Sequence, residues 1–128
     1  CVGLAVKQED ATAQNRLGAM YEDGLGVARS AREAFELFGL AAQQGYAPGM
    51  ANLGRAYAHG NGVKRDEIHA YVLITAAVQI GFKQSDRDAA VYQLGALSQR
   101  LDARQIERAQ ADARALVETR LKQASTIA

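Results

Sequence analysis

The sequence predicts an all-α fold, an α/α superhelical solenoid of helix-turn-helix repeats with a C-terminal capping helix pair. Alanine is abundant and aromatic residues are scarce, with no Trp among 128 residues, which favours closely packed helices over a β-sandwich. The chain has one proline, Pro48, so long helices run uninterrupted almost everywhere. The strongest observation is an internal repeat with a period of 36 residues.

The repeat is visible when residues 11–45 are laid over residues 47–81. Thirteen identities then align without a gap, and a unit of this length accommodates two helices and two turns. In the first copy the identical residues are Ala11, Leu17, Gly18, Tyr21, Gly24, Gly26, Val27, Arg29, Ala34, Leu37, Ala41, Gln43 and Gly45.

The first helix of the first copy is predicted over residues 11–22, and a glycine-rich turn follows over residues 23–30. Gly18 lies inside this helix, and Gly54 occupies the same position in the second copy. A glycine inside a helix costs about 0.5–1 kcal/mol relative to alanine. Because both copies carry this cost at one position, we expect the backbone of a partner helix to approach closely there.

The motif Ser30-Ala-Arg-Glu33 fits a capping box, in which the serine accepts a bond from an early N–H and the glutamate reaches back. It predicts a second helix over residues 31–44, which Gly45 ends because glycine adopts a left-handed conformation at little cost. The second copy is predicted to use Asp66 as the N-cap and Gly81 as the stop.

These residues resemble the Sel-one-like repeat (SLR) family of bacterial type, a relative of the tetratricopeptide repeat. The matching motif positions in the first copy are Ala11, Leu17, Gly18, Tyr21, Gly24, Gly26, Val27, Ala34, Ala41, Ala42 and Gly45. Those in the second copy are Ala47, Leu53, Gly54, Tyr57, Gly60, Gly62, Val63, Ala70, Ala76, Ala77 and Gly81. The resemblance covers residues 11–81 and implies a tetratricopeptide-like solenoid.

We expect residues 1–128 to form a single solenoid domain. Glu9 stands where the repeat would place a glycine, so an irregular turn is expected there. Near the end, Asp102-Ala-Arg-Gln105 fits a capping box for a helix that runs to about Lys122. The predicted segments are 1–9 as the remnant of a preceding repeat helix, 10–45 and 46–81 as repeats, and 82–128 as capping helices.

No catalytic, cofactor or metal site is predicted. The segment from Gly60 to Arg65 lacks the strand and the Ser/Thr of a phosphate-binding P-loop, so we interpret it as a turn. His59 and His69 are ten residues apart without a metal-ligand spacing. Cys1 is the sole cysteine, which excludes an internal disulfide. We therefore expect a protein that is not an enzyme.

The charges exclude further classes of function. The net charge is +1, with no basic stretch of the kind that nucleic-acid binding requires, and no segment is long and apolar enough to span a membrane.

A lipid-anchored mature chain would begin with a cysteine, but the apolar residues after Cys1 favour the end of a helix and an arbitrary boundary. The resemblance favours localisation in the bacterial cell envelope or periplasm, and the cytoplasm is the alternative location.

The candidate binding surface follows from the geometry of stacked helical hairpins, whose first helices line the concave side. Leu17, Gly18 and Tyr21 are expected to face the second helix, which leaves other positions of the first helices nearer the groove. These mixed polar side chains suit a peptide backbone or an acidic group. The predicted groove residues are Asn15, Arg16, Glu22, Asn52, Arg55 and His59.

The resemblance implies a protein–protein interaction scaffold or adaptor that holds a protein or peptide in this groove. Two alternatives stay open: a hydrolase-like envelope enzyme of the type linked to some secreted relatives, and a structural spacer in a longer chain. Those relatives carry a disulfide inside each repeat, which this chain cannot form. The apolar Val2, Leu4 and Val6 also suggest homo-oligomerisation through the N-terminal edge.

Overall fold

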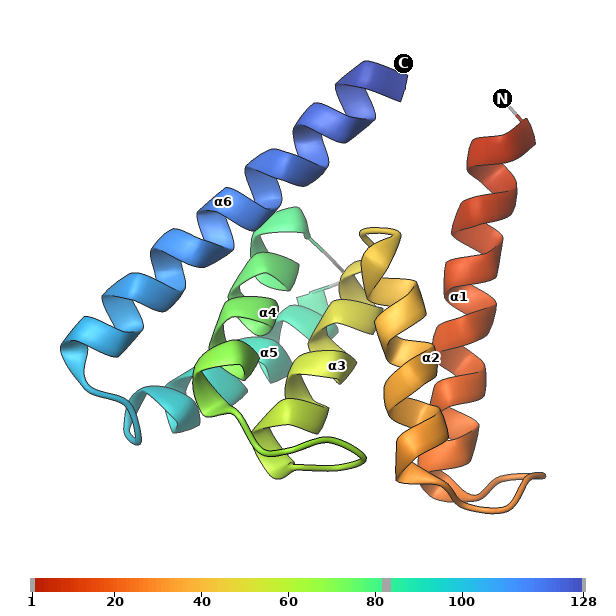
Figure 1. Cartoon of the computed structure of the whole chain (residues 1–128), viewed down its shortest axis with the longest axis horizontal. Helices are drawn as coiled ribbons and strands as arrows, with labels where there is room; N and C mark the ends of the chain where they lie inside the picture. The colour runs from red at the N-terminus through yellow and green to blue at the C-terminus, as the bar shows by residue number, and fades with distance from the viewer. Residues whose placement is uncertain (1, 82–83, 128) are drawn as a thin grey trace.

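The computed structural model describes residues 2–81 and 84–127, with the side chains of residues 10–81 and 87–119. The described chain consists of helices and connecting turns, without strands (Figure 1). The predicted all-α class is confirmed. The helices are α1 (Val2–Asp23), α2 (Ala31–Gln43), α3 (Ala47–His59), α4 (Glu67–Ile80), α5 (Gln84–Ser98) and α6 (Ala103–Ile127).

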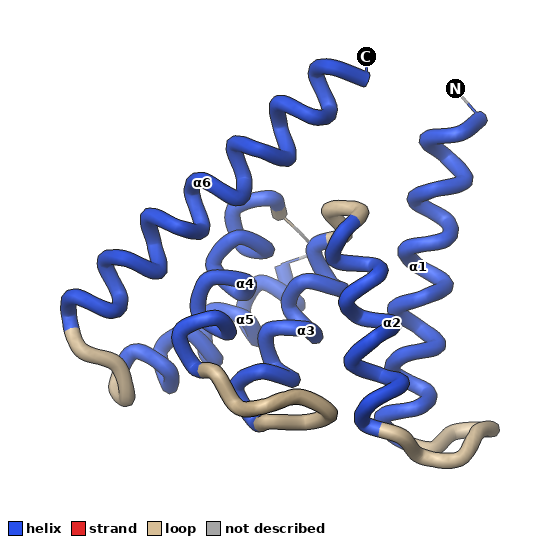
Figure 2. Tube along the Cα trace, in the orientation of Figure 1, coloured by secondary structure: helices blue, strands red, loops and turns tan. Residues whose placement is uncertain are grey.

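Helices α1 to α4 stack in chain order in a solenoid of helical repeats (Figure 2). Helix α1 packs against α2, and α3 packs against α4, each pair being joined by a glycine-containing turn. Helix α2 also packs on α3, which joins the first pair to the second. Helices α5 and α6 both pack on α4, so the C-terminal pair covers the last helix of the repeats.

Both second helices begin at the predicted N-caps. The Ser30 Oγ accepts a hydrogen bond from the Glu33 N–H at 3.2 Å, and the Asp66 Oδ1 accepts one from the His69 N–H at 3.0 Å. The capping box of Ser30 and Glu33 differs from expectation at the Ser30 N–H. The Ser30 N–H donates to the Tyr21 carbonyl at 2.9 Å, which takes the place of the predicted bond to the Glu33 side chain.

The predicted glycine stops also end their helices. Gly45 has a φ of 77°, its N–H donates to the Ala42 carbonyl at 2.9 Å, and the Tyr46 N–H donates to the Ala41 carbonyl at 3.3 Å. These two bonds form a Schellman motif, which satisfies carbonyl groups at the end of a helix. Gly81, with a φ of 103°, ends α4.

The expected close approach of helices occurs at both repeated glycines. A Cβ on Gly18 would lie 2.7 Å from the Phe38 Cε1, and a Cβ on Gly54 would lie 2.7 Å from the Ile74 Cγ1. Phe38 and Ile74 occupy the same repeat position and are fully buried. The two copies therefore nest their helices in the same way, with a large side chain of the second helix over the glycine of the first.

The N-terminal segment differs from the predicted remnant of a separate helix. Helix α1 is continuous from Val2 to Asp23, so the expected turn near Glu9 is wrong. The reason is that Glu9 and its neighbours include neither the glycine that ends α2 and α4 nor a proline. Cys1 lies outside the described residues, and the side chains of Val2, Leu4 and Val6 lie outside the described side chains.

Leu17, which is expected to face the second helix, is only partly covered. Its side chain is 39% exposed, whereas Leu53, at the same position of the second copy, is 9% exposed. Leu53 lies on α3, which α2 covers, and it belongs to a buried cluster that includes Ala34, Phe38 and Ala42 of α2. In the described part of the chain no helix covers α1 as α2 covers α3, which explains the exposure of Leu17.

The C-terminal pair is attached to the second repeat by apolar and ionic contacts. Its predicted capping box is complete: the Asp102 N–H donates to Gln105 at 3.0 Å, and the Gln105 N–H donates to Asp102 at 2.8 Å. Helix α6 extends to Ile127, beyond the predicted end near Lys122. Glu67 pairs with Arg65 at 2.5 Å and with Arg100 at 3.3 Å, which links the start of α4 to the turn before α6.

Candidate functional site

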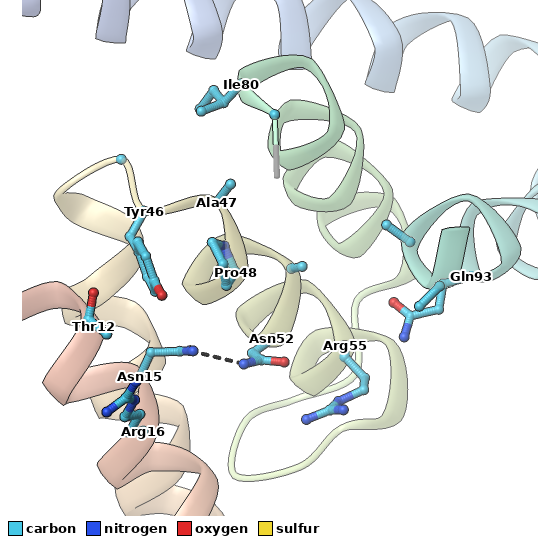
Figure 3. Close-up of a pocket in the computed structure, with 15 residues that line it drawn as sticks. Thr12, Asn15, Arg16, Tyr46, Ala47, Pro48, Asn52, Arg55, Ile80 and Gln93 are labelled. Atoms are coloured by element: carbon cyan, nitrogen blue, oxygen red, sulfur yellow. Dashed lines mark hydrogen bonds between the residues drawn. The ribbon is translucent and has the colours of Figure 1, made fainter. Parts of the chain in front are cut away.

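A concave groove of about 770 Å³ runs across the first helices of the repeats (Figure 3). Helices α1, α3 and α5 and the turns that follow α2 and α4 form its walls. Its lining residues are Thr12, Asn15, Arg16, Gly45, Tyr46, Ala47, Pro48, Ala51, Asn52, Arg55, Ile80, Gly81, Ala89, Ala90 and Gln93.

Four of the predicted groove residues, Asn15, Arg16, Asn52 and Arg55, line this groove. Glu22 lies outside the lining but contacts it through Arg55. His59 is exposed at the end of α3 and is not among the lining residues. The helical register of α1 and α3 thus brings most of the predicted side chains together, and His59 lies too far along α3 to join them.

Two polar links join the repeats at the groove. The Asn52 Nδ2 donates to the Asn15 Oδ1 at 2.9 Å, and both side chains lie on the groove (Figure 3). The Arg55 Nη2 donates to the Glu22 Oε1 at 2.6 Å, in an ion pair whose side chains are 34% and 26% exposed. Partial burial strengthens such a pair relative to a fully solvated one. Both links join α1 to α3.

Several lining residues did not follow from the sequence as site residues. Tyr46 and Ile80 lie beside the two turns that close the groove, and Gln93 comes from α5. A signal for α5 was present in Gln93-Leu94-Gly95, which echoes Arg16-Leu17-Gly18 of the first repeat. This similarity indicates that α5 takes the place of the first helix in a third repeat, and residues of α5 continue the groove wall.

A second cleft, of about 860 Å³, lies between α2, α4 and α6 and is more apolar. Its lining includes the core residues Met50, Leu53 and Leu73, and Leu40, whose side chain is 45% exposed. Lining polar side chains come from Glu36, Gln43, His69 and Asp112. This cleft is a second concave surface of the described part of the chain.

Neither surface resembles a metal centre. Among the described residues, no group of three or more His, Cys, Asp or Glu side chains is placed to hold a metal ion. None of the described helices is long and apolar enough to cross a membrane. The groove instead supplies amides, guanidinium groups and hydroxyls, which are groups suited to non-covalent binding.

The comparisons with known proteins agree with this geometry. The family model of the Sel1 repeat matches residues 11–46 and 47–81, which together make up more than half of the chain. The chain belongs to the Sel1 repeat family. Sel1 repeats are generally protein–protein interaction modules.

A solved structure shares the arrangement of these Sel1 repeats. It is the crystal structure of a protective antigen of uropathogenic Escherichia coli, described as displaying an SLR fold. The TM-score is 0.76 and the sequence identity is 26%, over 94% of this chain and 25% of the antigen. The Sel1 chain thus spans about a quarter of the length of that antigen. No curated protein matches the Sel1 chain in sequence.

Proposed function

We propose that this Sel1 repeat chain is an interaction scaffold that binds a protein or peptide segment in the concave groove. One observation carries the proposal: the groove gathers polar side chains of both repeats on one continuous surface. Asn15 and Arg16 come from α1, whereas Asn52 and Arg55 come from α3. An extended segment of a partner crossing both helices would therefore contact both repeats at once.

The dimensions and the chemistry of the groove support this function. Its volume of about 770 Å³ exceeds that of a single side chain, and its walls include apolar atoms from Pro48, Ala51 and Ile80 beside the polar groups. Apolar contacts supply affinity, and the fixed amides supply orientation. These features support a binding role for the groove.

The test is to select peptides that bind the chain from a display library and to measure each on two filled variants. Ala89→Trp fills the groove from the exposed face of α5, and Leu40→Trp fills the second cleft in the same manner. We expect Ala89→Trp to weaken binding about tenfold or more and Leu40→Trp to leave it unchanged. Loss of binding in the Leu40→Trp variant alone would move the site to the second cleft and contradict the proposal.

A further inference from the structure

The charged side chains of the groove are unevenly engaged. Arg55 lies in the groove but is paired with Glu22 at 2.6 Å. Arg16 also lies in the groove, is exposed, and forms no ion pair within the described part of the chain. The groove lining contains these two arginines and no Asp or Glu. Arg16 therefore supplies the one uncompensated charge on this surface.

The asparagine pair also leaves hydrogen-bonding capacity unused. In the bond between the two amides, Asn52 acts as the donor and Asn15 as the acceptor. The Asn15 NH₂ group and the Asn52 Oδ1 make no hydrogen bond within the described residues. A donor and an acceptor side by side complement the C=O and N–H of a peptide backbone. The amides suit any sequence, so they do not select a partner by themselves.

We infer that the groove takes an extended acidic segment of a partner protein, with an Asp or Glu carboxylate against Arg16 and the backbone against Asn15 and Asn52. The inference rests on the proposed function and names the partner's chemistry. The choice of carboxylate follows from charge complementarity, because a guanidinium binds a carboxylate through short charge-assisted bonds. The carboxylate is assigned to Arg16 and not to Arg55, because Glu22 already pairs with Arg55.

Glu22 gives the inference a second, opposite consequence. Its carboxylate compensates Arg55, so it lowers the positive charge that the groove presents to a partner. Replacing Glu22 by the isosteric glutamine keeps an oxygen that accepts from Arg55 and removes the compensating charge. We therefore expect Arg16→Gln to weaken the binding of acidic peptides and Glu22→Gln to strengthen it.

The probe is an array of peptides in matched pairs that differ only by Glu or Gln, acetylated and amidated so that side chains carry all the carboxylates. We expect the Glu member of each pair to bind about threefold to fivefold more tightly, and the difference to shrink as salt is raised. Arg16→Gln should abolish this preference, and Glu22→Gln should increase it. Arg32→Gln, on the exposed surface of α2 and outside the groove, is the matched control and should change nothing.

Equal binding of Glu and Gln peptides, with binding still lost in Ala89→Trp, would overturn this inference and leave the proposed function standing. A Glu preference that persists in Arg16→Gln would also overturn it. Binding of the array that is indifferent to Ala89→Trp would remove both the proposed function and the inference. Circular dichroism of each variant checks that the helices are retained.

Discussion

At the scale of single residues, one motif occurs in two environments. Leu17-Gly18-Ala19 lies in α1 and Leu94-Gly95-Ala96 in α5. A Cβ on Gly18 would lie 2.7 Å and 2.9 Å from atoms of the buried Phe38 ring, whereas a Cβ on Gly95 would meet nothing within 4 Å. The difference arises because α2 nests over Gly18, whereas α6 packs on α4 instead of over Gly95.

The first prediction concerns these two glycines. We expect Gly18→Ala to destabilise the fold by about 1–3 kcal/mol, because the new methyl overpacks the fully buried Phe38 ring. Gly95→Ala should stabilise it by about 0.5–1 kcal/mol, because alanine favours the helix and the space is open. Urea unfolding of both variants measures the two effects. A Gly18→Ala variant as stable as Gly95→Ala would contradict the nested packing.

The close approach at Gly18 and Gly54 could be predicted from the sequence, because a residue that disfavours a helix at the same position of both repeats indicates a shared packing contact. The exposure of Leu17 could not be predicted, since its burial depends on whether another helix covers α1. The groove could be predicted only in part. The positions of Asn15 and Asn52 follow from helical register, whereas the hydrogen bond between them depends on how the repeats are stacked. Tyr46 and Gln93 join the groove only through tertiary contacts of the turns and α5.

At the scale of elements, the turn between paired helices is built twice in the same way. The Ser30 N–H donates to the Tyr21 carbonyl, and the Asp66 N–H donates to the Tyr57 carbonyl, each at 2.9 Å. The end of one helix is thereby joined to the start of the next. The bounds of these inner helices were predictable because their caps lie in the sequence, whereas α1 and α6 extend beyond expectation because no cap or breaker ends them there.

The second prediction concerns the N-cap of α4. Asp66→Ala removes the acceptor of the His69 N–H and should lower the free energy of unfolding by about 1 kcal/mol. Asp66→Asn retains a side-chain oxygen in that position and should cost much less. Thermal unfolding followed by circular dichroism compares the two. If both variants lose the same stability, the contribution comes from the charge of Asp66 and not from the cap.

At the scale of the whole molecule, apolar side chains are exposed on the N-terminal face of the array. The exposed fractions are 39% for Leu17, 38% for Met20 and 61% for Leu25. In the second copy, the equivalents of the first two residues are Leu53 and Ala56, which are buried. The same repeat surface is therefore covered by α2 in one place and open in the other, and we expect it to associate with a second copy.

The third prediction follows from this face. Sedimentation velocity over a range of concentrations should show self-association, and the double variant Leu17→Glu/Leu25→Glu should weaken it about tenfold or more. Val91→Glu is the matched control, because Val91 is an exposed apolar residue of α5, with 52% of its surface accessible. A strictly monomeric parent chain, or equal weakening by the control, would count against association through this face.

The links of Asn15 to Asn52 and of Glu22 to Arg55 also affect how the array bends. They join α1 to α3 on the concave side, so straightening the superhelix stretches them, whereas further bending does not. We therefore expect the array to resist opening at the groove more than it resists closing. Its curvature at the groove depends on two polar side-chain bonds at the surface, so it can change by substitution there while the apolar packing beneath stays the same.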